Sequence, residues 1–418
     1  MGNKIFKSEM LQKKYQIFVS PYNFEKQVKK NLKIKKVNIC DTTVRDGEQT
    51  PGVVFSREEK IKLARMLSIL GVFQIEVGCS ATSKLERKII KEIVQIKKKE
   101  NWTTSIMVWS RPIKRDIDAA IETGCDAIAI SIATSDIHLK YKLRKTKQEI
   151  LEIIRNAILY AKSHHLYISI NAEDASRTDL GFLIKFGNVA KKAGADRIRL
   201  CDTVSAMNPS ATKFLIKRVR KLVNLPIEIH AHNDYGLALA NSLAAIEEGA
   251  EFVSTTVNGI GERCGNCSLE QIIMCLTHLY DFNQNSYKIN YLKDISNFTE
   301  KSSAIKISAG APFVGKLAFT HESGIHVDGL TKYSYTYESF PPEILGRKRN
   351  IVLGKHSGKA SIKLFLKKYG IICNEEEIFK ILEKVKTFSE IKKRCISSKE
   401  FLDIVSDIKN NKIVNKSS

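Results

Sequence analysis

The chain has 418 residues, of which 43% are hydrophobic, 27% are charged and only eight are proline. This composition excludes a disordered chain, and no apolar run reaches the roughly 18 residues that a membrane-spanning helix needs. Basic residues outnumber acidic ones by 68 to 45, which gives a formal net charge of +23. Most of them are lysines dispersed along the chain, as on solvated helix faces. We therefore expect no nucleic-acid partner and no membrane partner, but an attraction for acidic small molecules.

The nine cysteines are scattered along the chain rather than grouped in a disulfide framework. This indicates reduced thiols in a reducing compartment, so we expect a cytoplasmic protein, with a plastid stroma as an organellar equivalent. Residues 1–36 are rich in lysine and lack a long apolar run. We expect this segment to be a basic N-terminal extension that packs on the main domain.

Short apolar runs recur about every 30 residues after residue 36, with helical patterns between them. The first helical pattern begins with a capping box of Ser56 and Glu59 and ends at Gly71. A glycine also precedes later strands, as expected of a left-handed helix C-cap. Strands that alternate with helices predict parallel pairing, and eight units predict a (β/α)₈ TIM barrel over residues 37–280. The apolar runs cover residues 37–40, 72–77, 103–108, 127–132, 167–170, 197–200, 227–229 and 252–257.

An open doubly wound sheet is the alternative fold. Such a sheet that bound a dinucleotide would carry GxGxxG after its first strand, whereas this chain reads DTTVRD at 41–46. Strand patterns fade after residue 280, and residues 375–392 form an amphipathic helical pattern. The sequence therefore predicts a TIM-barrel domain followed by a smaller, mainly helical C-terminal region at 281–418.

Polar residues follow the predicted strands, at the barrel end where TIM-barrel enzymes have their active sites. The sharpest feature is His230-Ala231-His232, because residues two apart on a strand point to the same side. Two imidazoles and one carboxylate can bind a divalent ion and leave positions open for substrate. Asp46, which follows the first strand, is the candidate carboxylate. Two polar loop histidines without a metal are the alternative.

Other polar segments suggest further roles in the same mouth. Arg45 suits an enolate or carboxylate oxygen, because a guanidinium keeps its charge. The glycines Gly259, Gly261 and Gly265 of the segment 258–266 offer backbone amides that could cradle a phosphate or a thioester oxygen, although a tight loop explains them equally well. His326 in the C-terminal region is a candidate general base.

Three motifs together resemble the 2-isopropylmalate synthase/homocitrate synthase family of DRE-TIM metallolyases. They read DTTVRDGEQTPG at 41–52, HAHNDYGLA at 230–238 and NGIGERCGN at 258–266. The C-terminal motifs are most similar to those of homocitrate synthases of the nitrogen-fixation type, namely THESGIHVDGL at 320–330, TYE at 336–338, GR at 346–347 and LGKHSG at 353–358.

The resemblance implies an acyltransferase that condenses acetyl-CoA with 2-oxoglutarate and then hydrolyses the thioester, giving homocitrate and CoA. It implies a homodimer and a divalent metal ion, with Zn, Mn, Mg and Co left open. It also implies a role for each matching residue. These are Asp46, His230, His232 and Asn266 as metal ligands; Arg45, Glu173, His326 and Tyr337 in catalysis, the last two from the second protomer; and Gln49, Arg177 and Thr203 at the substrate.

Alternative activities remain open within the family. A 2-isopropylmalate synthase would use 2-oxoisovalerate, a citramalate synthase would use pyruvate, and a hydroxymethylglutaryl-CoA lyase would run a cleavage. Glu76, Met107 and Trp109 are expected to line the pocket for the side chain of the 2-oxo acid. A second carboxylate on that side chain needs a cationic partner, for which the sequence offers Arg111.

Overall fold

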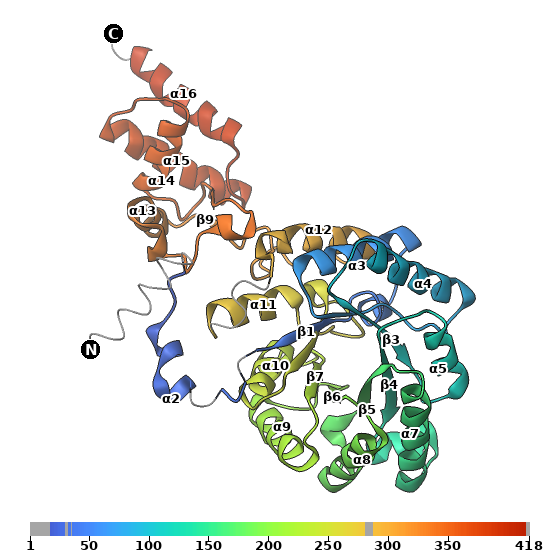
Figure 1. Cartoon of the computed structure of the whole chain (residues 1–418). Coiled ribbons are helices and arrows are strands. Elements are labelled where there is room, and N and C mark those ends of the chain that lie inside the picture. The colour runs from blue at the N-terminus through green and yellow to red at the C-terminus, as the bar shows by residue number, and fades with distance from the viewer. Residues whose placement is uncertain (1–16, 30–31, 35, 281–286, 415–418) are drawn as a thin grey trace. The chain divides into compact units, whose positions relative to one another are not determined.

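The computed structural model describes residues 17–29, 32–34, 36–280 and 287–414 (Figure 1). Much of the predicted extension at 1–36 lies outside the described residues. Its described part includes the helix α2 (Lys26–Lys29). Among the described residues, no helix combines the length and the apolar character that crossing a membrane requires.

Eight parallel strands close into a barrel in sequence order, which confirms the predicted TIM barrel. The barrel closes where Asn38 of the first strand pairs with Phe252 of the last. All eight predicted apolar runs overlap a strand. The strands are β1 (Asn38–Asp41), β2 (Gln74–Glu76), β3 (Ser105–Ser110), β4 (Ala127–Ala133), β5 (Tyr167–Glu173), β6 (Arg197–Asp202), β7 (Ile227–Ala231) and β8 (Phe252–Thr255).

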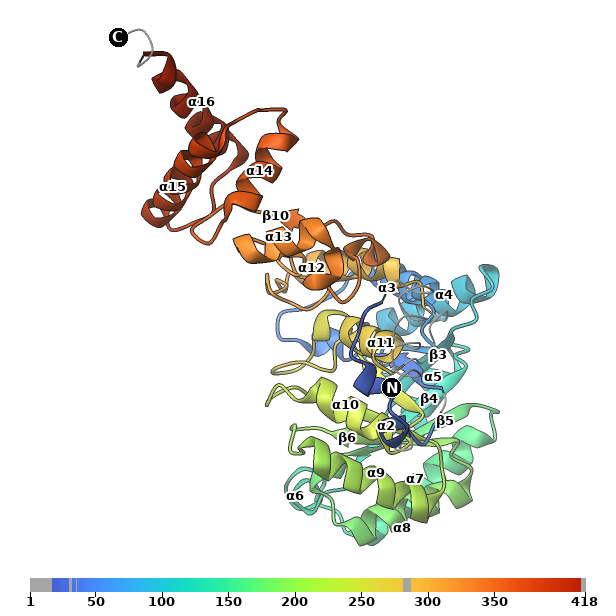
Figure 2. The same ribbon diagram turned by 90° about the vertical axis from the view of Figure 1, so that its left-hand side faces the viewer.

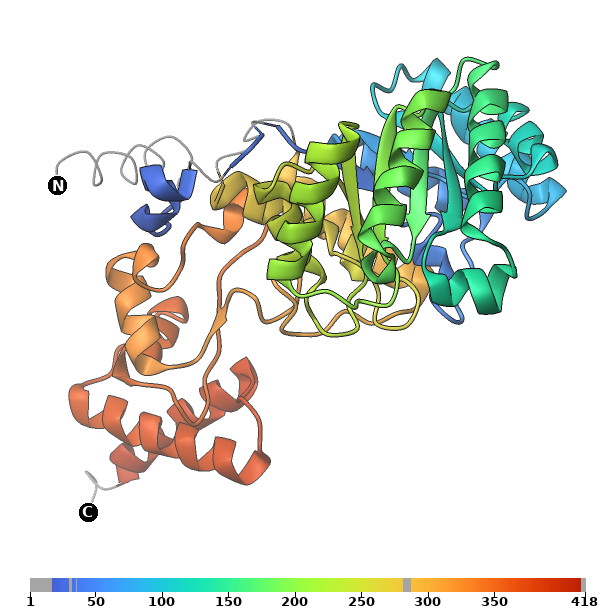
Figure 3. The ribbon, with the colours of Figure 1, turned by 90° about the horizontal axis from the view of Figure 1, so that it is seen from below.

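Helices form the outer layer around the strands (Figures 1 and 3). The predicted capping box of Ser56 and Glu59 is present at the start of α3, and Gly71 ends this helix with a left-handed φ of 99°. The main barrel helices are α3 (Arg57–Leu70), α4 (Lys84–Lys99), α5 (Lys114–Ile121), α7 (Lys147–Lys162), α8 (Leu180–Ala193), α9 (Pro209–Val223), α10 (Ala238–Glu247) and α11 (Leu269–His278), with the short α6 (Asp136–His138) between β4 and α7.

The interior of the barrel contains buried charges as well as apolar side chains. Arg197 and Arg199 on β6 and Glu228 on β7 are at most 1% exposed. Glu228 lies 2.8 Å from Arg197 and 2.9 Å from Arg199, while Glu76 on β2 lies 2.7 Å from Arg199. Burying charges costs free energy unless they are paired, so these residues depend on one another. We call Arg45, Glu76, Arg199, Glu228 and Arg197 the ionic chain.

The chain divides into two compact units, one of Tyr22–Ile307 and the other of Ser308–Ser418 with the segment up to Pro21. The barrel unit extends past the expected boundary at residue 280 because α12 (Leu292–Ser303) packs on α3. Asn258 Nδ2, in the loop after β8, also donates to the Ser296 carbonyl of α12 at 2.9 Å. Near the N-terminus, the Phe18 amide donates to the Ser339 carbonyl at 2.6 Å, and both residues belong to the second unit.

The second unit is mainly helical, as predicted. Its last three helices pack around a core that includes Leu366, Ile381, Val385 and Phe401 (Figure 2). The predicted helix at 375–392 is present with these bounds. The elements of this unit are β9 (Thr320–His321), α13 (Gly324–Lys332), β10 (Asn350–Ile351), α14 (Lys359–Lys368), α15 (Glu375–Lys392) and α16 (Ser398–Val414).

Candidate active site

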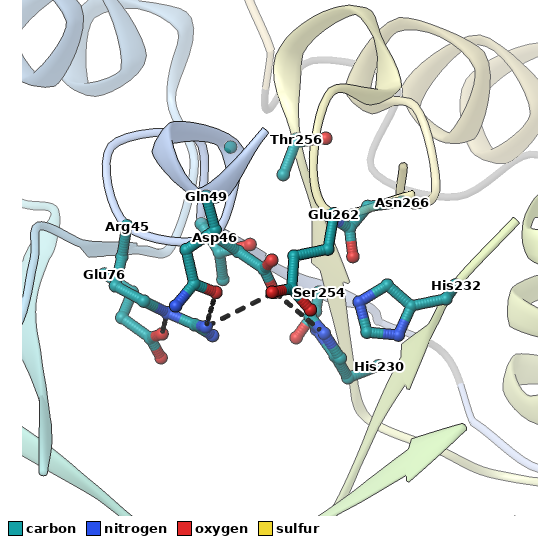
Figure 4. Close-up of polar contacts among 12 residues, drawn as sticks. Arg45, Asp46, Gln49, Glu76, His230, His232, Ser254, Thr256, Glu262 and Asn266 are labelled. Carbon is teal, nitrogen blue, oxygen red and sulfur yellow. Dashed lines mark hydrogen bonds and ion pairs between the residues drawn. The ribbon is translucent and has the colours of Figure 1, made fainter. Parts of the chain in front are cut away.

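Asp46, His230 and His232 converge at the C-terminal end of the barrel strands. Asp46 follows β1, His230 lies on β7, and His232 follows β7 directly. All three side chains are buried, and each offers a ligand atom within 4.8 Å of the others. Asp46 Oδ2 lies 3.0 Å from His230 Nε2 (Figure 4). The fold therefore brings the two histidines and the carboxylate together, as the sequence predicted.

The surroundings hold Asp46 and His232 in forms that bind a cation. The His232 Nδ1 lies 3.3 Å from the Asp202 carbonyl, so Nδ1–H can donate there and leave the Nε2 lone pair free. Burial, aided by His230, lowers the pKa of His232 to about 4. Burial alone would raise the pKa of Asp46, but Arg45 and His230 lower it well below its usual range. At neutral pH the site thus presents a neutral His232 imidazole and an anionic carboxylate.

Asn266 supplies a further donor atom. It forms an isolated bridge with His232, and its Nδ2 donates to the Ile260 carbonyl at 3.1 Å. The Oδ1 atom is buried and accepts no hydrogen bond from any described residue. Two imidazoles, one carboxylate and one amide oxygen form a donor set that suits a divalent transition metal, with Mg²⁺ less favoured by the imidazoles. The residues present therefore fit the divalent ion that the resemblance implied.

Arg45 lies beside this cluster, and ion pairs with two carboxylates hold its guanidinium in place. Its Nη1 lies 3.4 Å from Asp46 Oδ2 and donates to Gln49 Oε1 at 3.3 Å, and its Nε bonds to Glu76 (Figure 4). Glu76 uses its other oxygen for Arg199, so it bridges the two arginines. Such a fixed guanidinium at the mouth of a metal site can stabilise negative charge that develops on a substrate oxygen.

The cluster opens into a cavity of about 200 Å³. The cavity brings together seven predicted site residues from the ends of different strands, and it adds side chains that were not predicted. The lining residues are Arg45, Asp46, Gln49, Trp109, Ser131, Lys142, Asn171, Glu173, Arg199, Cys201, Thr203, His230, His232 and Glu262.

Two of the three expectations about the pocket walls need correction. Trp109 lines the cavity as expected, but Met107 is fully buried and contacts Arg197 Nη2 at 3.4 Å. Glu76 is likewise fully buried and serves as the bridge between the two arginines. Strand side chains alternate in direction and also differ in depth, and these two residues lie too deep in the barrel to form a wall.

Arg177 does not line this cavity. It pairs with Asp174, three residues earlier, with 2.9 Å between Nη2 and Oδ2. The loop at 258–266 folds on itself, because the Gly259 amide donates to Thr256 and the Gly265 amide to Glu262. Neither amide is therefore free for a ligand.

His326 and Tyr337 belong to the second unit, where they are already together. Their rings stack with centroids 4.0 Å apart and an interplanar angle of 28°. Nearby, His321 Nε2 lies 3.3 Å from Glu338 Oε1, and Arg349 Nε donates to the same carboxylate at 2.8 Å. This unit therefore presents an imidazole and a phenol as one pair.

A second cavity of about 560 Å³ shares part of its wall with the first. The two have Trp109, Ser131, Lys142 and Glu173 in common, while the second is mostly apolar and adds Ile113, Ile132, Leu143 and Ile153. Arg111 lines only this second cavity and pairs with Asp116 at 2.6 Å. Arg111 therefore does not line the cavity of Asp46, His230 and His232, where it was expected to pair with a second carboxylate of the substrate.

Sequence reasoning missed Arg199, Asn171, Ser131 and Lys142 in the site. A signal was present for Arg199, because Arg197-Ile198-Arg199 places two arginines on one face of a strand whose other residues before Asp202 are apolar. Charges two apart in a buried strand must face a polar interior or a partner. The other three residues carried no comparable signal.

A closed parallel barrel with a His₂-carboxylate cluster at its strand ends defines the class of metal-dependent barrel enzymes. The chain belongs to the HMGL-like family, whose family model matches residues 36–299. The model described as "Homocitrate synthase post-HMGL domain-like" matches residues 313–393. The protein is therefore an enzyme of the HMGL-like synthase family.

Relatives with different names are about equally similar. The chain is 45% identical to "2-isopropylmalate synthase 2" of Caldanaerobacter subterraneus subsp. tengcongensis over 90% of this chain and 97% of the relative. It is 44% identical to "Homocitrate synthase AksA" of Methanothermobacter thermautotrophicus over 94% and 98%. The fold is similar to hydroxymethylglutaryl-CoA lyase from Pseudomonas aeruginosa, with a TM-score of 0.59, 22% identity, and coverage of 66% of this chain and 96% of that one.

Proposed function

We propose that the protein condenses acetyl-CoA with 2-oxoglutarate and hydrolyses the resulting thioester, releasing homocitrate and CoA. The observation that carries this proposal is the buried cluster of Asp46, His230 and His232 beside Arg45, which opens into a small polar cavity. The names of the relatives support condensation of acetyl-CoA with a 2-oxo acid in general. They support 2-isopropylmalate synthase and homocitrate synthase about equally.

Asp46, His230, His232 and Asn266 would hold the divalent ion. When bound, the ion supplies a Lewis acid that binds a 2-oxo acid and polarises its ketone. Arg45 is positioned by Asp46 and Glu76 to stabilise the negative charge that develops on the keto oxygen during attack. Gln49 and Thr203, which line the same cavity, would hold substrate oxygens.

The condensation needs a base for the acetyl methyl group and later a water for the thioester. Glu173 lines the cavity, bonds to Lys142, and lies 3.4 Å from His138 Nδ1. Loss of a methyl proton allows the methyl carbon to bond to the keto carbon, and hydrolysis then breaks the C–S bond and releases the CoA thiol. We assign the proton transfers to the stacked pair of His326 and Tyr337 with Glu173, and we place the pair in the partner protomer of a homodimer.

The mostly apolar second cavity suits the arm of a thioester substrate better than the loop at 258–266 does. It shares Trp109 and Glu173 with the metal cavity, so a thioester group could pass from one to the other. Arg111, Lys142 and Lys145 at its wall are cations that favour an anionic ligand. In the loop at 258–266, two of the three candidate amides, those of Gly259 and Gly265, already donate to backbone carbonyls of the chain.

The experiment is release of free thiol from acetyl-CoA by the purified protein with each of several divalent metals. The 2-oxo acids are 2-oxoglutarate, 2-oxoisovalerate, pyruvate and oxaloacetate. Turnover mainly with 2-oxoglutarate supports the proposal. Preference for 2-oxoisovalerate or pyruvate replaces the substrate but keeps the condensation, and no thiol release with any acid and any metal contradicts the condensation itself.

A further inference from the structure

We propose that Arg199 is the residue that selects a 2-oxo diacid, by binding the carboxylate at the far end of the substrate. This inference rests on the proposed condensation of a 2-oxo acid and names the substrate class that the cavity selects. Nothing in the sequence motifs singled out Arg199. The inference comes from its position at the cavity, its unused donor and the charge around it.

Arg199 lies on β6 and lines the metal cavity although its residue is only 1% exposed. Its Nη1 donates to Glu76 Oε2 at 2.7 Å, and its Nε lies 2.9 Å from Glu228 Oε1. Its Nη2 donates no hydrogen bond to any described residue. A buried guanidinium normally uses its donors, so an unused Nη2 at a cavity marks a place for an acceptor that is not part of the chain.

Neighbouring strands place polar side chains in one layer with Arg199. Asn171 on β5 pairs with Arg199 in the strand register, and Ser131 on β4 pairs with Asn171. All three line the cavity. Ser169 Oγ donates to Asn171 Oδ1 at 3.2 Å, which leaves the Asn171 Nδ2 donor for another partner. A guanidinium, an amide and a hydroxyl in one layer form a site for a carboxylate.

The buried charges beside the metal site also favour a dianion, once the exposed Glu262 and the mutually paired Lys142 and Glu173, which also line the cavity, are set aside. The ionic chain and Asp46 together contain three arginines and three carboxylates. A bound divalent ion would therefore leave two positive charges in excess, and a 2-oxo diacid neutralises both. A 2-oxo monoacid would leave one of them buried and uncompensated, which is unfavourable.

The other cations near the cavity are less suited to this role. Arg111 lines only the second cavity and pairs with Asp116. Lys142 is exposed and pairs with Glu173. Arg45 is nearest the metal cluster, where the keto and first carboxylate groups of the substrate would lie. Arg199 therefore remains as the cation for the second carboxylate.

The test compares binding of 2-oxoglutarate with binding of 2-oxopentanoate, which has the same five-carbon chain with a methyl group in place of the second carboxylate. Trp109 lines the cavity, so tryptophan fluorescence can follow binding to the whole protein with excess Zn²⁺, a cation that the imidazoles favour. We expect the wild type to bind 2-oxoglutarate at least about tenfold more tightly, as a charge-assisted hydrogen bond predicts. Arg199→Lys should reduce this preference to about twofold or less.

Arg197→Lys is the matched control. Arg197 lies two residues away on the same strand, is also fully buried and also pairs with Glu228, but it does not line the cavity. It should keep the wild-type preference for 2-oxoglutarate. If Arg199→Lys does not fold, Asn171→Asp provides a second route, because it adds a negative charge beside Arg199 while leaving the ion pairs in place. It should weaken 2-oxoglutarate binding about tenfold more than 2-oxopentanoate binding.

Equal wild-type affinities for the two acids would overturn the inference, as would equal losses for both acids in Arg199→Lys or in Asn171→Asp. Each of these results leaves the condensation possible with a monoacid. Failure of the proposed function would give a different result, namely no thiol release from acetyl-CoA with any 2-oxo acid. The binding preference can be measured in that case too, so the two failures are distinguishable.

Discussion

At the scale of single residues, the site depends on three buried side chains, and the surroundings of two of them, Asp46 and His232, set their protonation. Asp46 is kept anionic by Arg45 and His230, and burial keeps His232 neutral. Both effects favour cation binding at neutral pH without any movement of the chain. These candidate metal ligands therefore need little rearrangement to accept a cation, which reduces the free energy of reorganisation on binding.

Asp46→Asn should abolish tight binding of a divalent ion, because it removes the only carboxylate of the described cluster. We expect kcat/KM to fall by about 10³-fold or more, and metal affinity measured by calorimetry to fall in parallel. Glu262→Gln is the control, since Glu262 lines the same cavity but is not in the cluster. Similar losses in both variants would contradict the assignment of Asp46.

The histidines of the site could be predicted from the sequence, whereas the partners that orient Arg199 could not. His230 and His232 are two apart at the end of an apolar run, and this local spacing is enough to place both on one side of a strand. Arg199 is held in place by its hydrogen bond to Glu76, which is 123 residues away in the chain and lies on another strand of the barrel. No local pattern reports such a partner.

At the scale of elements, the barrel was predictable from the recurrence of apolar runs and from the glycines that end helices. The predicted ends of strands were less accurate for β5 and β6, which extend to Glu173 and Asp202 rather than stopping at 170 and 200. Polar residues at strand ends resemble loop residues in a sequence. In an enzyme barrel the polar residues at the C-terminal ends of strands still belong to the strands, and they form the active site.

The junction of β1 and β8 contains a buried carboxyl group whose ionisation opposes folding. Asp41 accepts hydrogen bonds from the Thr43 amide at 2.9 Å and from Thr255 Oγ1 at 3.1 Å. Burial raises the pKa of Asp41 to about 7, above the ordinary value of 3.8. The folded state therefore binds this proton more tightly than the unfolded state, and the stabilisation from Asp41 is lost as the pH rises through about 7.

Asp41→Asn should remove this dependence on pH, because the amide is neutral and can replace both hydrogen bonds. The free energy of unfolding of the variant, relative to the wild type, should rise by roughly 2 kcal/mol between pH 5 and pH 7. Urea unfolding at several pH values measures it. Parallel curves for the two proteins would show that Asp41 titrates at its ordinary pKa.

The loop after β8 holds Asn266 through a close approach of two backbone segments. A Cβ atom at Gly265 would lie 1.9 Å from the Gly259 carbonyl oxygen, and Gly265 has a φ of +83°. Alanine at this position must therefore distort the loop. Gly236 has a similar φ of +71° but open space around it.

Gly265→Ala should weaken metal binding by about tenfold or more, since the distorted loop carries Asn266. Gly236→Ala should cost only about 1 kcal/mol of stability from its backbone conformation and leave metal affinity unchanged. Metal titration and thermal unfolding of both variants separate the two effects. Equal metal affinities in the two variants would mean that Asn266 does not contribute.

At the scale of the whole molecule, the candidate residues are divided between two units. The cluster of Asp46, His230 and His232 belongs to the barrel unit. His326 and Tyr337 belong to the C-terminal unit. Sequence motifs could identify both sets, because each motif is local. We propose that a partner protomer brings them together, and the sequence contains no periodic or local pattern that predicts such an assembly.

A mixture of two inactive variants should recover activity if the proposed homodimer shares its sites. Asp46→Asn lacks a metal ligand and His326→Ala lacks the imidazole, but a mixed dimer contains one site with both residues intact. Random pairing predicts about a quarter of the wild-type activity after the subunits exchange. Thiol release measures it, and each variant mixed with itself is the control. No recovery, with subunit exchange verified by labelled protein, would place His326 in its own chain's site.

The ionic chain through the barrel also limits how this protein can diverge. Arg45, Glu76, Arg199, Glu228 and Arg197 alternate in sign, and each contacts the next. Loss of one partner from a buried pair costs about 3–5 kcal/mol, which is a large part of the stability of a typical domain. Changes that remove a charge at these positions must therefore arrive as compensating pairs. Replacement of Arg199 by a neutral residue would require a second, simultaneous replacement at Glu76 or Glu228, deep in the barrel.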